Sequence, residues 1–169
     1  MSSLLHRLTY TLVILTSFIL MLVIGLSFAP VQNAIGGPLL DMLWTGEAAQ
    51  PRLNEMNAAE RSVHLWGTLL NDTLYPLAYG AFFAGLAGRF AGRRWEAWAM
   101  LPAGLTVLVD LAENMVQALA LAGQPSLLAL KTVLTPLKFG LLMCAALLGL
   151  GLAIMALVGW IRRRSSRPR

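Results

Sequence analysis

Ionisable and amide side chains recur at helical spacing within one apolar stretch, residues 96–122. The segment VDLAENMVQ, residues 109–117, interrupts sequence that is otherwise apolar. Its polar residues and one preceding threonine recur every three or four positions: Thr106, Asp110, Glu113, Asn114 and Gln117. At ~100° per residue this spacing places them on one face of a helix. Because lipid offers no partner to an ionised carboxylate, this face should point into a helix bundle or a wet cavity.

Two further apolar stretches carry polar faces that match this one. In residues 63–88 the face holds His64, Thr68, Asn71, Asp72, Tyr75 and Tyr79, and in residues 128–160 it holds Lys131, Thr135 and Lys138. Three such helices can shield their polar residues from lipid only by turning them toward one another. We therefore predict one functional cluster and ligand site with these members: Asn71, Asp72, Tyr75, Tyr79, Asp110, Glu113, Asn114, Gln117, Lys131 and Lys138.

The charged members of this cluster point to two kinds of role. Asp110 and Glu113 lie one turn apart in a region of low dielectric, where we expect one carboxyl to be protonated and the other ionised, as acid–base chemistry requires. The other role is structural, with an Asp110–Lys138 ion pair that fixes the helix register; losing one partner of such a pair typically costs ~3–5 kcal/mol. One pair would suffice for register, so three carboxylates and two lysines favour a function.

The histidines and the cysteine exclude several other kinds of site. His6 and His64 are expected at opposite membrane faces, which excludes a bis-histidine haem site. No pair of residues has the Glu-x-x-His spacing of a di-metal bundle. Cys144 is the sole cysteine, so an intrachain disulfide and a C-x-x-C redox pair are excluded. We expect neither a metal nor another cofactor, and we assign no catalytic residue.

The elements that must position these residues are long apolar helices. Of the 169 residues, 57% are apolar and only 12% are charged, which is typical of a membrane protein. Four stretches, 9–29, 63–88, 96–122 and 128–160, reach or exceed the ~20 residues that cross a membrane as a helix. They lack the alternation of membrane strands, so we predict an all-α, four-transmembrane-helix bundle in one domain. The first stretch is longer than a signal-peptide core, and we expect it to stay as an anchor.

The distribution of positive charge predicts the orientation of this bundle. Arginines precede the first stretch, lie between the second and the third, and fill the tail 161–169, whereas the outer loop 30–62 mixes both signs. By the positive-inside rule, both termini are cytoplasmic. The net charge of +5 then reflects topology and contact with anionic lipid, and we expect no nucleic-acid partner. The five charges of the cluster fall in the outer half of the membrane.

The outer loop is expected to cover the mouth of the bundle. The segment IGGPLLDMLW, residues 35–44, is typical of a short amphipathic helix lying in the outer interface. The segment NAAE, residues 57–60, has the form of a capping box, so the next helix should begin about two turns before the membrane. Within that helix Pro76 frees the carbonyl of Asp72, which we expect to accept a hydrogen bond from a lysine of the cluster or from a ligand.

The segments NDTLYPLAYG and LVDLAENMVQ resemble a pattern of small bacterial four-helix membrane proteins of unassigned function. The pattern is D-x-x-Y-P-x-x-Y in the second helix, D-L-x-E-N in the third and a lysine in the fourth. It is carried here by Asp72, Tyr75, Pro76, Tyr79, Asp110, Glu113, Asn114 and either Lys131 or Lys138. The resemblance implies a multi-pass protein of the bacterial cytoplasmic (inner) membrane and supplies no activity. In plan alone the chain is distantly similar to EXPERA-type sterol isomerases and sigma-2-like receptors, which are bundles with acidic residues in a lipid-accessible pocket.

Three functions are compatible with these observations. The one they favour is the binding of a small amphipathic molecule or a membrane lipid in an ionisable pocket, with or without acid–base chemistry. The second is an accessory subunit that binds a membrane-protein partner or another copy of itself, with the charges as an internal ion-pair network. The third is proton- or ion-coupled transport, although the chain lacks the internal repeat common in transporters. The ligand and any enzymatic activity stay open.

Overall fold

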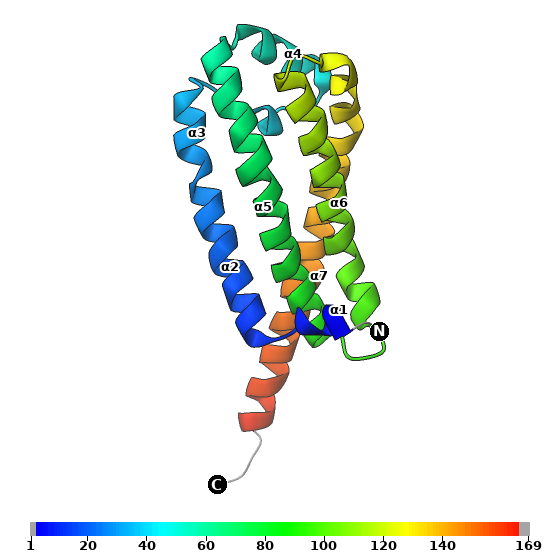
Figure 1. The fold of residues 1–169 in the computed structure, drawn as a ribbon. Coiled ribbons are helices and arrows are strands. Elements are labelled where there is room, and N and C mark those ends of the chain that lie inside the picture. Colours follow the sequence, from blue (N-terminus) through cyan, green and yellow to red (C-terminus); the bar gives the residue numbers. More distant parts are fainter. Residues whose placement is uncertain (1–2, 166–169) are drawn as a thin grey trace.

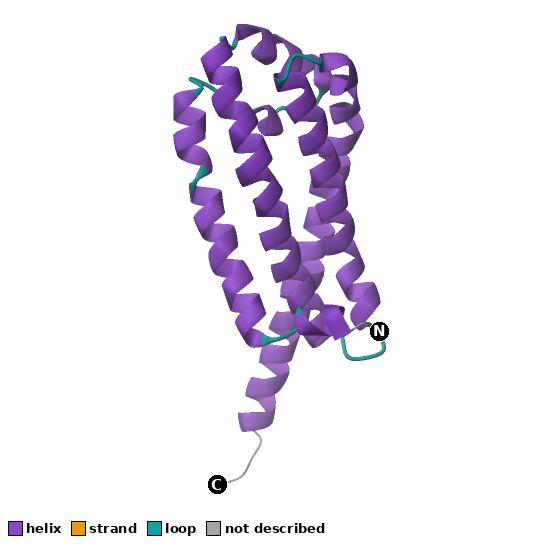
Figure 2. Ribbon diagram, viewed as in Figure 1, coloured by secondary structure: helices purple, strands orange, loops and turns teal. Residues whose placement is uncertain are grey.

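The computed structural model describes residues 3–165 and is built from helices (Figure 1). Its α-helices are α1 (Ser3–Arg7), α2 (Thr11–Leu26), α3 (Phe28–Ala34), α4 (Gly46–Glu55), α5 (Ala58–Phe90), α6 (Glu96–Leu121) and α7 (Lys131–Ser165), and its 3-10 helices are η1 (Leu40–Met42) and η2 (Pro125–Leu130). Between residues 3 and 165 there is no strand (Figure 2), which confirms the all-α expectation. The last part of the basic tail, 166–169, lies outside the described residues.

Four long helical segments run side by side along the molecule (Figure 1). They are α2 with its continuation α3, α5, α6 and α7, and α5 is central because it packs against α2, α6 and α7. The helix α1, the α5–α6 connection and the far end of α7 lie toward one end of the bundle, which we call the α1 end. The segments η1, α4 and η2 lie at the other, the α4 end.

Among the described residues, three segments are long and apolar enough to cross a membrane: Thr11–Ala34, Glu96–Leu121 and Pro125–Ser165. Their outward faces carry large apolar side chains such as Leu12 and Leu147, which are 76% and 67% exposed. Such faces are stable in lipid and unstable in water, which indicates a membrane protein. Helix α5 has 33 residues and is long enough to cross a membrane. Its polar side chains make it less apolar than the three segments above, and it is not one of them.

Helix α5 begins with the capping box that the sequence predicted. The Asn57 side-chain oxygen accepts hydrogen bonds from the backbone N–H groups of Ala59 and Glu60 at 2.9 and 3.0 Å. In return the Glu60 carboxylate accepts from the Asn57 backbone N–H at 2.9 Å. Three backbone N–H groups at the helix start are satisfied in this way, two by the Asn57 side chain and one by the Glu60 side chain. The predicted start of the helix is confirmed.

Small residues allow α5 to approach its neighbours closely. A Cβ atom added at Gly80 or Gly88 would collide with the side chains of Val107 or Met100 on α6. On α7, a Cβ at Gly149 would lie 3.2 Å from the carbonyl oxygen of Phe83. These close contacts place α6 and α7 firmly against α5. These glycines are therefore used for packing inside the bundle.

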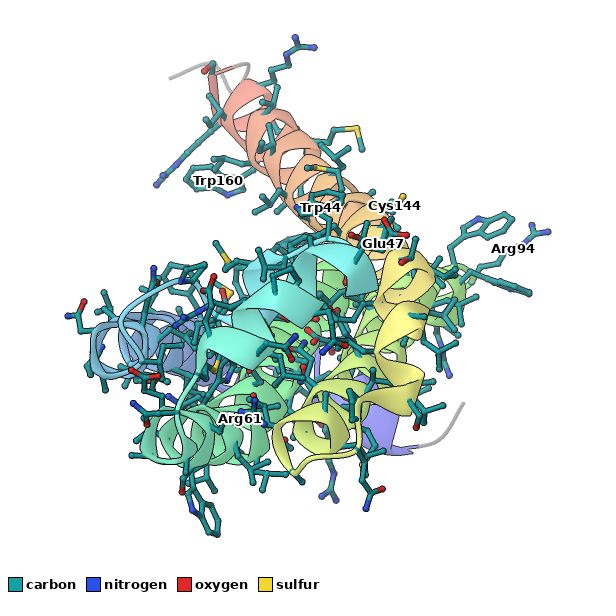
Figure 3. All side chains as sticks on the ribbon, turned by 90° about the horizontal axis from the view of Figure 1, so that it is seen from above. Trp44, Glu47, Arg61, Arg94, Cys144 and Trp160 are labelled. Carbon is teal, nitrogen blue, oxygen red and sulfur yellow. The ribbon has the colours of Figure 1, made fainter. Side chains whose placement is uncertain are left out.

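The outer loop folds down onto the α4 end as a compact cap. Leu40, Ala49 and Leu53 of the loop are buried against Leu121 and Leu128 of the bundle. At Gly46 the chain passes so close to η2 that an added Cβ would lie 2.6 Å from the Leu128 carbonyl oxygen. Viewed from this end, α4 lies across the ends of the other helices (Figure 3). The expected amphipathic helix over residues 35–44 is wrong, because the segment forms only the three-residue η1 and buries Leu39 and Leu40 against the bundle.

Candidate functional site

The ammonium group of Lys138 lies among three carboxylates near the α4 end. Its Nζ atom is 2.5 Å from Asp41 Oδ1, 2.8 Å from Glu113 Oε2 and 3.4 Å from Asp110 Oδ1. The lysine comes from α7, two of the carboxylates from α6 and the third from η1. Because Lys138 is only 3% exposed, these carboxylates replace the water that its charge would otherwise require. We call Asp41, Asp72, Asp110, Glu113, Lys131 and Lys138 the charge cluster.

One part of the charge cluster is sealed from its surroundings. Lys131 donates to Glu113, and the Thr135 hydroxyl donates to the same carboxylate oxygen at 2.6 Å. All three side chains are fully buried. Glu113 also contacts the Lys138 ammonium, so each of its two carboxylate oxygens has a lysine partner. We call the ion pair of Lys131 and Glu113, together with the Thr135 hydroxyl that donates to it, the sealed pair. Its geometry is that of a structural ion pair.

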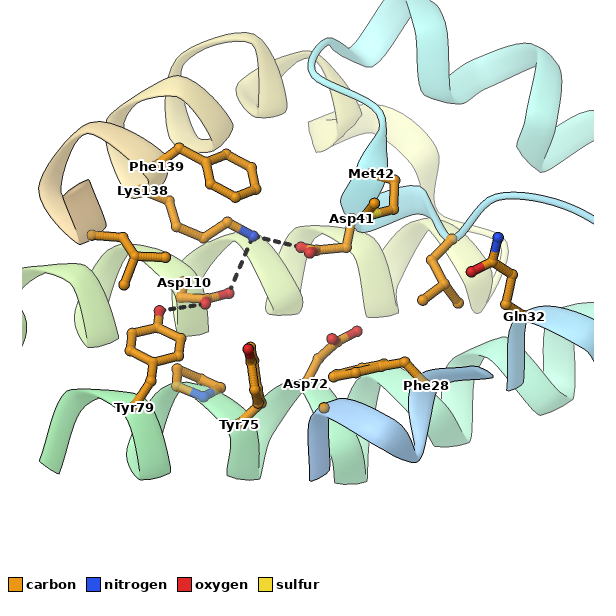
Figure 4. A pocket seen from close by; sticks show the side chains of 14 residues that line it. Phe28, Gln32, Asp41, Met42, Asp72, Tyr75, Tyr79, Asp110, Lys138 and Phe139 are labelled. Carbon is orange, nitrogen blue, oxygen red and sulfur yellow. Dashed lines mark hydrogen bonds and ion pairs between the residues drawn. The ribbon is translucent and has the colours of Figure 1, made fainter. Parts of the chain in front are cut away.

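The other part of the charge cluster faces a cavity of about 320 Å³ (Figure 4). The cavity is lined by Gly25, Phe28, Gln32, Leu39, Asp41, Met42, Asp72, Tyr75, Pro76, Tyr79, Asp110, Lys138, Phe139 and Leu142. Inside it the Tyr79 hydroxyl donates to Asp110 Oδ2 at 2.6 Å. The lining combines an ionisable floor with aromatic and aliphatic walls, which is the usual make-up of a small-molecule site. We call this cavity the pocket.

The position of the pocket follows from which helices pack together. Helices α2 and α3 pack on α5, and α7 packs on α5 and α6, while α2 and α7 form no extensive interface with each other. The pocket lies in the space this leaves, with Phe28 and Gln32 of α3 on one side and Phe139 and Leu142 of α7 on the other. The 3-10 helix η1 covers it with Asp41 and Met42. Two of the segments that are apolar enough to cross a membrane therefore border the pocket.

Asp72 lines the pocket without an ion-pair partner among the described residues. Its backbone carbonyl, freed by Pro76, accepts a hydrogen bond from Asn114 Nδ2 at 2.5 Å. The expectation that this carbonyl acts as an acceptor is confirmed, but its donor is an amide of α6 and not a lysine or a ligand. The Asp72 backbone is therefore held in place while its side chain stays directed into the pocket (Figure 4).

The structure brings most of the predicted site residues together. Five of them line the pocket: Asp72, Tyr75, Tyr79, Asp110 and Lys138. Glu113 and Lys131 belong to the sealed pair, Asn114 holds the α5 backbone, and Gln117 Nε2 donates to Asp41 at 3.3 Å. Asn71 is separate, because its amide donates to the Ser27 hydroxyl at 2.9 Å and so ties α5 to the α2–α3 junction. Its predicted place in the cluster is wrong.

Asp41 lies at the centre of the site but is not among the residues predicted from the sequence. Its carboxylate contacts Lys138 and Gln117, although it belongs to the outer loop. Burial raises the pKa of Asp41, but the nearby Lys138 ammonium and its hydrogen bond outweigh this and hold the pKa below its usual range. The only sequence signal was an acidic residue between leucine and methionine in IGGPLLDMLW. Asp41 therefore connects the cap to the charge cluster.

A second residue that fixes the cap is His64. Its Nε2 atom accepts a hydrogen bond from the backbone N–H of Leu40 at 2.9 Å, so this nitrogen carries no proton. Its Nδ1 atom lies 3.2 Å from the Thr68 hydroxyl, and the ring is 1% exposed. Because Leu40 immediately precedes Asp41, the neutral histidine sets the position from which Asp41 reaches Lys138.

Oxygens of Asp41, Asp110 and Glu113 lie within 4.8 Å of one another, as the ligands of a hard cation would. The Lys138 ammonium contacts all three carboxylates. A metal ion at this place would have to displace the lysine, so the donor set fits the ammonium group. Comparisons of the chain with protein-family models, with curated proteins and with solved structures found no match.

Proposed function

We propose that the protein binds a small amphipathic molecule or a lipid in the pocket between α3 and α7. The observation that carries this proposal is a cavity with an ionisable floor, placed between two helical segments that are apolar enough to lie in a membrane. A ligand with a polar head and an apolar body matches both environments. The ligand would enter sideways from the lipid, past Phe28 and Leu142.

The proposal includes a four-span topology in the bacterial inner membrane, with the α4 end outside. Positive side chains gather toward the α1 end, where Arg7, Arg89, Arg93, Arg94 and the run 162–164 lie. The positive-inside rule makes this the cytoplasmic end. Helix α5 is long enough for the fourth span, and its polar residues are turned toward the bundle, where Thr68, Asp72 and Tyr79 are buried. The pocket would then open in the outer leaflet.

Acid–base chemistry on the ligand would use Asp110 and Tyr79. They are joined by a 2.6 Å hydrogen bond and both line the pocket. Glu113, expected to act as the partner of Asp110, is fully buried in the sealed pair and has no surface in the pocket. Proton transfer to a ligand requires a group within hydrogen-bond reach, which Glu113 lacks. Binding is the core of the proposal.

The accessory-subunit function keeps support from one observation, the sealed pair. A fully buried ion pair contributes register between helices and needs no ligand. Such a subunit should be unstable alone and should purify with a partner. Ion transport finds less support, because toward the α1 end the described core contains an apolar cluster of Ala84, Met100, Ala103 and Ala145 between Asp110 and the buried Glu96.

Photolabelling tests the proposal directly. The purified protein would be placed in vesicles that contain a phospholipid with a diazirine in its acyl chain, and labelled peptides would be mapped by mass spectrometry. Binding predicts labels on the pocket walls at residues 25–32 and 139–142. Leu142→Trp should fill the pocket and remove these labels, while the matched control Leu147→Trp, on the exposed face of α7, should leave them. Uniform labelling of all lipid-facing residues in every variant would overturn the proposal.

A further inference from the structure

One carboxyl group of the pocket has no cation opposite it. Within the described chain no lysine, arginine or histidine nitrogen lies within 4.0 Å of the Asp72 carboxylate, whereas Asp41, Asp110 and Glu113 all contact Lys138. Its hydrogen-bond partner is the hydroxyl of Thr68, one turn earlier on α5, and Lys138 acts on it only from beyond ion-pair distance. The residue is only 6% exposed. A carboxyl this buried is stable either when protonated or when a cation from outside lies beside it.

The charge cluster as a whole is short of positive charge. Four carboxyl groups face two ammonium groups, so the formal charge is −2 when all are ionised. Glu113 binds Lys131, and the remaining lysine is shared by three carboxylates. An anionic head group entering the pocket would meet like charge and no unoccupied cation. A cationic head group would be attracted.

The walls beside Asp72 are aromatic. Figure 4 shows its carboxyl beside the rings of Tyr75 and Phe28, whose centroids are 5.5 Å apart in an edge-to-face arrangement. Tyr79 continues the row, 5.4 Å from Tyr75. Aromatic faces attract ammonium groups, and the attraction is larger where water is excluded. A carboxylate with flanking aromatic rings is therefore suited to an ammonium group and ill suited to a phosphate or a carboxylate.

We propose that the ligand is a cationic amphiphile whose ammonium head pairs with Asp72, an inference that rests on the proposed function. The pocket of about 320 Å³ is at the small end of ligand sites, so it holds the head and the nearest part of the body. The rest of the body passes between Phe28 and Leu142 toward lipid. If Asp72 is protonated before binding, its proton moves to the neutral amine, and the same carboxylate–ammonium pair results.

Three probes of matched shape test the charge preference: 4-phenylbutylamine, 4-phenylbutanol and 4-phenylbutyrate. Their dissociation constants would be measured by isothermal titration calorimetry on the full chain in an uncharged detergent. We expect the amine to bind roughly tenfold or more tightly than the alcohol, and the carboxylate to bind most weakly, since a charge-assisted hydrogen bond is involved. This comparison on the wild-type chain needs no variant.

Two variants then locate the preference. Asp72→Asn keeps the shape of the side chain and should make amine and alcohol bind equally. Asn71→Ala is the matched control, because Asn71 contacts Ser27 and does not line the pocket, so all three dissociation constants should stay as in the wild type. Equal binding of amine and alcohol to the wild type, or an amine preference that survives in Asp72→Asn, overturns the inference and leaves the proposed function standing. Binding of none of the probes, together with uniform photolabelling, overturns both.

The ammonium head has two sources, an amine-headed phospholipid or a free hydrophobic amine. Native mass spectrometry of the protein in nanodiscs of phosphatidylethanolamine or phosphatidylcholine separates them. A lipid source predicts bound phosphatidylethanolamine that 4-phenylbutylamine displaces from the wild type and that Asp72→Asn does not retain. A free-amine source predicts no retained phospholipid in either nanodisc while 4-phenylbutylamine still binds.

Discussion

The sealed pair and the Asp72 wall of the pocket are neighbours in the bundle, since Asn114, next to Glu113, donates to the Asp72 carbonyl, yet they are built in opposite ways. In the sealed pair the Glu113 carboxylate contacts the ammonium groups of two lysines, accepts a hydrogen bond from a threonine hydroxyl and is fully buried. In the pocket wall Asp72 has aromatic neighbours, and no cationic side chain of the described residues lies within 4.0 Å of its carboxylate. A buried charge with partners in the chain fixes how the helices pack. A buried charge without such a partner lowers the stability of the free protein, and it is kept when a ligand supplies the partner. This difference is the basis on which we propose a structural role for Glu113 and a ligand-binding role for Asp72.

The largest effect is expected from breaking the sealed pair. Lys131→Met leaves Glu113 with the Lys138 ammonium it already shares and without the lysine that contacts its other oxygen. We expect the free energy of unfolding to fall by about 3–5 kcal/mol, the usual cost of removing one partner from a buried ion pair. Unfolding in detergent, followed by circular dichroism during titration with sodium dodecyl sulfate, measures this change.

The control for this prediction removes both charges of the sealed pair. Lys131→Met with Glu113→Leu should recover most of the lost stability, because an apolar pair of similar volume leaves no charge unpaired. If Lys131→Met alone leaves the unfolding curve unchanged, the sealed pair has no structural role. The contrast with the pocket wall would then disappear.

The sequence predicted the parts of the site that depend on local periodicity. Asp110 and Glu113 are three residues apart on one helix, so their common direction follows from the helix geometry alone, and both contact Lys138. The capping box at Asn57 is equally local. Asn71 was misplaced because it lies at the edge of its polar face, where a small rotation of α5 turns it to the Ser27 hydroxyl.

The spacing of polar residues along the sequence predicts which side of a helix they occupy, but it does not predict the path of a loop. Asp41 lies in a loop and was therefore not predicted. Its position depends on contacts far away in the sequence, including the acceptor that His64 offers to Leu40 and the close approach at Gly46. The leucines of the segment 35–44 suit an interfacial helix as well as they suit a buried cap. Only the presence of apolar partners on α6 and η2 decides between the two.

The cap that covers both parts of the charge cluster should depend on His64. His64→Leu removes the acceptor of the Leu40 N–H group, a buried donor, and an unsatisfied donor of this kind costs about 1–3 kcal/mol. We expect faster cleavage of the connection between α3 and α5, residues 35–57, by an added protease while the long helices stay protected. His64→Gln, which keeps an acceptor oxygen, is the control. Identical cleavage rates in all three proteins would show that the hydrogen bond does not hold the cap.

A smaller effect is expected from acid, acting through Asp41. Its pKa in the folded protein lies below the ordinary value of 3.8, so its bond to Lys138 stabilises the cap above that pH and is lost as the pH falls through the folded value. Trp44 stacks on Phe139 at 5.3 Å and reports on the cap. We expect its fluorescence, taken as the difference from Trp44→Phe, to change only below about pH 3.8. In Asp41→Asn the acid change should be absent, and a change centred well above this pH would contradict the assignment.

The smallest effect on stability is expected at Asp72, and its smallness is what distinguishes the pocket wall from the sealed pair. Asp72→Asn removes a carboxyl that pairs with no cation of the described chain, so no partner is orphaned. The free energy of unfolding should stay the same or rise by about 1 kcal/mol, as for residues kept for function at a cost to folding. Asp110→Asn, which loses Lys138 and weakens the bond to Tyr79, is the contrasting variant and should lower it. A loss at Asp72 as large as that at Lys131 would mean that Asp72 has an essential partner in the folded chain, and the two parts of the charge cluster would then be structural alike.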